Sequence, residues 1–174
     1  MLAEAHLEEL RRLYEDVRRC APELDFQRPG IGFRKPRGSP GLAPHLSVWV
    51  LTDATQSPSG RDFGALAAAT FRRYGRKLFA RLVARSAVRA DGRVGWYGLV
   101  LTWIGPSQSA GRAVGETLVL FADKPLVADF VAGALPATTF LAGVDLRAFD
   151  GQTEVRLPTL AVDDAEGGTS GEGC

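Results

Sequence analysis

The residues with the strongest chemical signal are cations on one predicted helix. They recur at three- and four-residue spacing with no acid between positions 62 and 91: Arg72, Arg73, Arg76, Lys77, Arg81, Arg85 and Arg89. Like charges four residues apart on a helix repel one another by roughly a few tenths of a kcal/mol per pair. Three interpretations stay open. The face is simply solvated, it is matched by acids elsewhere such as those of the C-terminal tail, or it binds a nucleic acid, an acidic protein or an anionic lipid surface.

A second group of cations lies in the stretch 22–45. Arg34 and Lys35 stand there beside further arginines at positions 28 and 37, with Phe26 and Phe33 between them. Cations interleaved with aromatic rings can grip phosphates and stack bases. The alternative, which we favour, is a solvated strap whose two aromatic side chains pin it to the body of the domain. Five prolines and several glycines predict no regular structure here, so we expect a long loop.

Catalytic or metal-binding groups are few. Asp53 and Asp123 each follow a predicted strand, and in the expected topology both emerge at one end of the sheet. Two carboxylates there could bind a divalent ion or share a proton, or each could simply cap the next helix. His45 has no glycine-flanked serine or activated cysteine to serve, and no phosphate-binding or dinucleotide-binding glycine motif occurs. An enzyme of unassigned type near Asp53 and Asp123 stays an alternative, but a non-enzyme is favoured.

Composition sets further limits. The chain has 174 residues, 45% of them hydrophobic and 24% charged, with a formal net charge of +1, which is typical of one globular domain and predicts no polyanionic partner from global charge. Two cysteines and two histidines without ligand spacing predict no metal site, and we expect no cofactor. No apolar run approaches the roughly 18 residues of a membrane span. No signal peptide is visible, so the default expectation is cytoplasmic, or exported if an N-terminal signal has been removed.

The elements that would position these groups follow from periodicity. Val94–Ile104 predicts a central strand because both of its faces are apolar, and Ala113–Ala122 predicts its antiparallel partner. Leu46–Thr52 predicts an earlier strand. A capping box at Ser59 and Asp62 starts a helix that runs from Gly60 to about Val88, and the open amides at its start could alternatively seat an anion.

The flanking segments complete the predicted domain plan. Apolar residues at three- and four-residue spacing predict an amphipathic helix over Ala3–Arg19. A short helix runs from Leu126 to about Leu135, and Asp150-Gly151 predicts a hairpin between Val144–Phe149 and Gln152–Leu157. The resulting plan is an N-terminal helix at 1–21, a Pro/Gly-rich basic loop at 22–45, an α+β core at 46–158 and a disordered acidic tail at 159–174.

These elements predict the α+β class and a fold of the ferredoxin-like type. The order strand, helix, strand, strand, helix, strand is that of a split β-α-β-β-α-β sandwich with helices on one face of the sheet, to which an N-terminal helix and a C-terminal hairpin are added. The two-faced apolar character of Val94–Ile104 then requires that the first helix crosses the sheet, or that a flat apolar surface is left for another chain. The leading functional prediction is therefore a non-enzymatic interaction or assembly module that docks a protein partner or itself through a sheet face or the basic helix. The alternative is a nucleic-acid-binding protein that uses the basic helix at 72–89.

Overall fold

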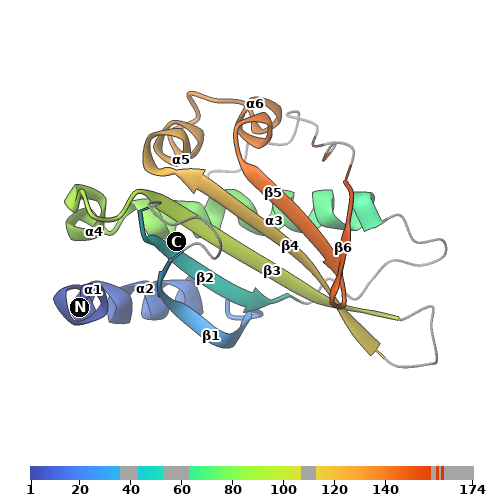
Figure 1. Cartoon of the computed structure of the whole chain (residues 1–174), viewed down its shortest axis with the longest axis horizontal. Coiled ribbons are helices and arrows are strands. Elements are labelled where there is room, and N and C mark those ends of the chain that lie inside the picture. The colour runs from blue at the N-terminus through green and yellow to red at the C-terminus, as the bar shows by residue number, and fades with distance from the viewer. Residues whose placement is uncertain (36–42, 53–62, 107–112, 158–159, 161, 163–174) are drawn as a thin grey trace.

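The computed structural model describes residues 1–35, 43–52, 63–106, 113–157, 160 and 162. Helices and strands alternate irregularly along these residues (Figure 1). In chain order they are α1 (Leu2–Ala5), α2 (Leu7–Cys20), β1 (Asp25–Arg34), β2 (His45–Leu51), α3 (Phe63–Val83), α4 (Ser86–Ala90), β3 (Trp96–Pro106), β4 (Ala113–Asp123), α5 (Lys124–Val131), α6 (Ala137–Ala142), β5 (Asp145–Asp150) and β6 (Thr153–Val155).

The strands form one mixed sheet whose spatial order is the chain order, β1 to β6. Only β2 and β3 are parallel, and α3 supplies the crossover that a parallel pair needs. The α+β class is confirmed, but the ferredoxin-like pairing is wrong. That pairing sets the first and third strands of the unit side by side and parallel, whereas here β3 separates β2 from β4 and β4 runs antiparallel to β3.

This topology separates the two acids that were expected together. Asp123 ends β4 opposite Trp96, which in turn pairs with His45 at the start of β2. Asp53 follows the other end of β2 and lies outside the described residues. The prediction that both carboxylates emerge at one end of the sheet is therefore wrong, because it depended on β2 and β4 being parallel.

The larger helices all cover one face of the sheet. In Figure 1, α3 passes behind the strands, with α2 beside β1 and with α5 and α6 at the opposite side. Alternate residues of β3 point into this layer, and Tyr97, Leu99, Leu101 and Trp103 are completely buried there. The helices contribute Leu13 and Val17 of α2 and an aromatic cluster in which Phe71, Phe79, Phe130 and Phe140 contact one another. The N-terminal helix therefore packs beside α3 and does not cross to the second face.

The first strand corrects the prediction of an irregular stretch at 22–45. Asp25–Arg34 pairs with β2, but the register shifts between Phe26 and Ile31, and Pro29 and Gly30 lie within that irregularity. Proline is tolerated at such a point because no regular ladder bond needs its missing N–H, and Gly30 takes a positive φ of 72°. Phe26 and Phe33 pack against the core, as the strap interpretation expected, although they do so from a strand.

Other boundaries differ in detail. The N-terminal helix breaks at His6, and the predicted helix to Val88 ends at Val83 and resumes as α4. The C-terminal hairpin is confirmed, with Gly151 at a φ of 62° between β5 and β6. Leu160 and Val162 are buried, so these two residues do not fit the predicted disordered tail. The remainder of that tail, the capping box at Ser59 and Asp62, and residues 36–42 lie outside the described residues.

Candidate functional site: the open face of the sheet

We use the term open face for the sheet surface opposite the helices, which no helix among the described residues covers (Figure 1). Strand alternation and register assign its side chains. They are Asp25 and Arg34 of β1; His45, Ser47, Trp49 and Leu51 of β2; Trp96, Val100, Thr102 and Ile104 of β3; Thr117, Val119, Phe121 and Asp123 of β4; Asp145, Arg147 and Phe149 of β5; and Glu154 of β6.

The centre of the open face is apolar. Val100 is almost buried by its neighbours at 3% exposure, and Trp49 and Val119, which pair with it in register on either side, are half-buried. Ile104, farther along β3, is 45% exposed. Charged groups of the open face lie at its margins, on β1, β5 and β6 and, with Asp123, at the end of β4. The surface is thus an apolar strip with a charged rim, which is the usual anatomy of a protein interface.

His45 is held as a neutral ring within this face. Its imidazole meets the ring of Phe121 edge-on, with centroids 4.8 Å apart. Burial, and secondarily the positive charge of Arg34, lowers the pKa of His45 to about 4. The imidazole is therefore uncharged near neutral pH, and its packing against Phe121 gives it a structural role.

Arg34 lies across the same face. Its guanidinium carbon stands 5.1 Å from the centre of the Trp49 ring, a cation–π contact. Arg34 Nε and Trp49 Nε1 are both buried and have no hydrogen-bond acceptor, and no ion pair joins Arg34 to a described acid. Burial lowers the pKa of Arg34. Two buried donors without acceptors are costly in a folded protein, and here both belong to half-buried side chains of the open face.

Part of the basic helix is engaged within the domain. Arg85 is nearly buried, and its Nη2 donates to Asp16 Oδ2 of α2 at 2.7 Å, with Glu9 Oε2 at 3.9 Å from Arg85 Nε. Arg73 lies 3.6 Å from Glu23 and over the ring of its neighbour Tyr74. Acids of α2 and the segment after it therefore offset part of the predicted charge repulsion on α3.

The other predicted cations do not form one surface with these. Arg76 stacks on Phe130 of α5, with its guanidinium carbon 4.6 Å from the ring centre. Arg72 and Lys77 are exposed and Arg81 is half-buried, all on the helix layer. Arg34 lies on the opposite face of the sheet, and the exposed Lys35 follows it. The structure thus places the basic helix on one face of the sheet and Arg34, which Lys35 follows, on the other.

Of the two carboxylates of the predicted enzyme site, Asp123 has a structural role, and Asp53 lies outside the described residues. Asp123 accepts a hydrogen bond from the backbone N–H of Leu126 at 2.8 Å and caps α5. This is the capping role that the sequence left open. Within the described residues, no three His, Cys, Asp or Glu side chains are grouped closely enough to hold a metal ion.

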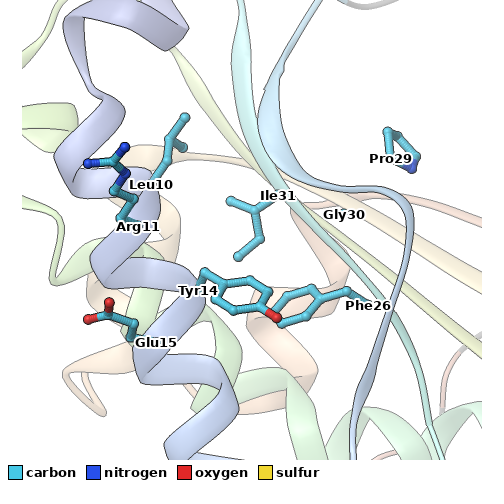
Figure 2. A pocket seen from close by; sticks show the side chains of 8 residues that line it. All are labelled: Leu10, Arg11, Tyr14, Glu15, Phe26, Pro29, Gly30 and Ile31. Carbon is cyan, nitrogen blue, oxygen red and sulfur yellow. The ribbon is translucent and has the colours of Figure 1, made fainter.

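Two further features were not predicted from the sequence. An apolar groove of about 410 Å³ lies between α2 and β1, where the rings of Tyr14 and Phe26 stack at 4.7 Å (Figure 2). Its other lining residues are Leu10, Arg11, Glu15, Pro29, Gly30 and Ile31. Because residues 22–45 were predicted to form a loop, no groove between this stretch and the N-terminal helix was expected.

The second is an ionic cluster that ties the N-terminus to the turn before β3. His6 Nε2 lies 2.8 Å from Asp91 Oδ2, and Arg93 Nη2 donates to the same oxygen at 2.6 Å. Hydrogen bonds from Arg93 and His6 hold the pKa of Asp91 well below its usual range. Lys124 Nζ donates to the carbonyls of Arg89 and Asp91, each at 2.9 Å. The side chains of His6, Asp91, Arg93 and Lys124 each have a partner within the fold, so the cluster acts as a clamp.

Two further observations concern the chain as a whole. No helix in the described ranges has both the length and the apolar character needed to cross a membrane. Cys20 is disulfide-bonded, and the sequence contains one other cysteine, Cys174, which lies outside those ranges. No protein-family model, curated protein or solved structure matches this chain.

Proposed function

We propose that the chain is a non-enzymatic interaction module that docks a protein through the open face. The observation that carries this proposal is the asymmetry of β2 to β5, whose helix side is fully covered while the other side presents Trp49, Ile104, Val119 and Phe149 with no described helix against them. A contiguous apolar surface rimmed by polar groups is typical of a protein-binding site.

The side chains of this face suit binding. Trp and Arg are enriched among residues that contribute most to interface affinity. Here Arg34 is stacked on Trp49, and both have buried donors without acceptors. A partner that brings a carboxylate to the half-buried guanidinium of Arg34 would gain a charge-assisted hydrogen bond while covering the apolar strip.

The two other functions receive less support from the geometry. A nucleic-acid interface on α3 would use Arg73 and Arg85, but these are paired with Glu23 and Asp16. The Arg34 group, which would have extended that interface, lies on the other face of the sheet. An active site built on Asp123 would lack the second carboxylate, because Asp53 follows the opposite end of β2.

Photo-crosslinking tests the proposal. A photoreactive phenylalanine analogue placed at Phe149, at the side of the open face, is expected to crosslink a protein in cells that express the full chain. The same analogue at Lys77, which is exposed on the helix layer, serves as the matched control. Val119→Lys places a charge in the apolar strip and is expected to abolish the crosslink from position 149 while leaving the fold intact. Equal crosslinking from both positions, or a product at 149 that survives Val119→Lys, would refute docking through this face.

A further inference from the structure

We infer that the occupant of the open face is a second copy of this chain, related to the first by a two-fold axis that runs across the strands in the plane of the interface. This inference rests on the proposed function and names its partner. In such a dimer each contact occurs twice, because the same surface is used by both copies.

The charges on the outer strands support this symmetry. On β1, Arg34 and Asp25 lie at opposite ends of the open face, since Arg34 pairs with the first residue of β2 and Asp25 with the last. On β5, Asp145 and Arg147 lie two residues apart on the same face. A rotation about an axis across the strands exchanges the two ends of every strand. It therefore places each acid near a base of the other copy.

Asp25 is available for this contact. Its side chain is 79% exposed, and its ion-pair partner among the described residues is Arg18, at the long distance of 4.0 Å. Arg34 has no acid partner among those residues. The intermolecular pair would therefore give Arg34 a carboxylate that the described part of the chain does not supply.

A two-fold axis parallel to the strands is disfavoured by the same residues. That axis exchanges the two edges of the sheet and keeps the ends of the strands in place. Asp25 pairs with Leu51, and along the same row Thr102 and Thr117 lead to Phe149 and then Glu154 on β6. Asp25 would then approach Glu154 of the other copy, and two carboxylates brought together across an interface repel.

The relief of the face also fits the axis across the strands. Gly32 and Ser47 form a low row on β1 and β2, and a Cβ built on Gly32 meets nothing within 4 Å. Trp49 stands two residues beyond Ser47 on the same face. Ser47 itself is completely buried, so an axis that passes between these rows sets the Trp49 ring of each copy toward the open space above Gly32 of the other, where a large group meets a small one.

The size of the surface sets the expected affinity. With strands about 4.8 Å apart and about 3.3 Å per residue, five strands of seven residues give a flat area of roughly 550 Å². Stable interfaces bury about 800 Å² per partner. The dimer is therefore expected to be reversible and concentration-dependent.

Charge reversal tests the inference on the purified full chain. Light scattering coupled to size exclusion is expected to show a mass that rises with concentration from one chain to two. Arg34→Asp and Asp25→Arg are each expected to weaken the dimer by at least about tenfold, because each substitution creates two like-charge contacts. The double variant Arg34→Asp/Asp25→Arg is expected to recover to within about threefold of the original dissociation constant. The matched control Lys77→Asp reverses an exposed charge on the helix layer and should leave the dimer unchanged.

The outcomes separate this inference from the function on which it rests. A chain that stays monomeric at every concentration, with a crosslink from position 149 that still depends on Val119, refutes the second copy and keeps docking through the open face. A monomer without that crosslink refutes both. A dimer that neither single reversal weakens, or that the double variant does not restore, refutes the two-fold arrangement. Asp25→Arg changes a largely exposed side chain, so this arm does not depend on how Arg34→Asp folds.

Discussion

The ring of Phe121 on β4 lies against the backbone of Gly98 on the neighbouring strand β3. A Cβ atom built on Gly98 would stand 2.9 Å from Phe121 Cε1 and 3.1 Å from the Cβ of Ser47. Such approaches are shorter than van der Waals contact, so only glycine lets the Phe121 ring lie this low over the sheet. The edge of the same ring contacts His45 on β2. The absence of a side chain at Gly98 therefore determines how far Phe121 stands above the sheet, and it affects the surface over β2, β3 and β4.

Gly98→Ala is expected to destabilise the protein by about 1–3 kcal/mol, because the added methyl group forces Phe121 out of its position. Gly32→Ala is the matched control, since it adds the same methyl group to the same face where nothing lies within 4 Å. Its effect is expected to stay within about 0.5 kcal/mol. Urea unfolding of the two variants measures both values. Equal destabilisation at the two positions would show that Phe121 does not depend on Gly98.

The strands with strong alternation were predictable from sequence, and the first strand was not. Residues 96–104 carry aromatic and β-branched side chains on both faces, so a central strand followed directly. Pro29 and Gly30 hid β1, because they are read as breakers unless the register shift that contains them is known. The order of strands also escaped prediction. After a crossover helix, the next strand can pair directly with the strand before the helix or leave room for another strand between them. The local sequence does not determine which of the two arrangements forms.

The candidate site was predictable only in part. Because β3 is apolar on both faces, we expected either that the N-terminal helix crosses the sheet or that one face stays without a helix. The structure places α2 beside α3, so the second alternative holds for the described residues. The pairing of Arg85 with Asp16 spans 69 positions in the sequence, so no local pattern could show that the basic helix is partly neutralised from within. A sequence does not distinguish an exposed cation from one that is paired within the fold, because the acid that pairs with it can lie far away in the chain.

Arg85→Ala is expected to cost about 2 kcal/mol of stability, because it leaves Asp16 with Arg19 as its remaining ion-pair partner and removes Arg85 from Glu9, and both carboxylates are less than one-fifth exposed. Lys77→Ala removes a charge from the exposed side of the same helix and should change stability by less than about 0.5 kcal/mol. Chemical unfolding of the two variants compares them directly. If both cost the same, Arg85 is not a structural ion-pair residue, and a role for it in binding would have to be reconsidered.

Tyr97→Phe is expected to be neutral or to stabilise the protein by up to about 1 kcal/mol. The Tyr97 side chain is completely buried in the core, and its hydroxyl has no hydrogen-bond partner among the described residues. Removing the hydroxyl relieves the cost of burying it and keeps the ring that packs beneath the helices. Burial also raises the pKa of Tyr97 to about 12, so the hydroxyl stays protonated at neutral pH and the comparison is between two uncharged rings. A loss of more than about 1 kcal/mol on thermal or urea unfolding would reveal a partner for this hydroxyl.

His45 should make stability depend on pH between about 6.5 and about 4. Burial, followed by the charge of Arg34, lowers the pKa of His45 from 6.5 to about 4 in the folded chain. The unfolded chain therefore binds the proton more tightly in this window, and stability falls as pH is lowered through it. Asp91, whose folded pKa is also depressed, acts only below its ordinary pKa of 3.8, so the two effects occupy different pH ranges.

The measurement is a series of urea unfolding curves from pH 7 to pH 4 on the wild type and on His45→Gln. The variant cannot titrate at this position, so the difference between the two slopes isolates His45. Arg34→Met removes the smaller cause and keeps the larger one, burial, so it should reduce the wild-type slope without abolishing it. Identical slopes in the wild type and His45→Gln would mean that the imidazole is as easily protonated in the folded chain as in water, and that the open face is far more solvated around Phe121 than its packing indicates.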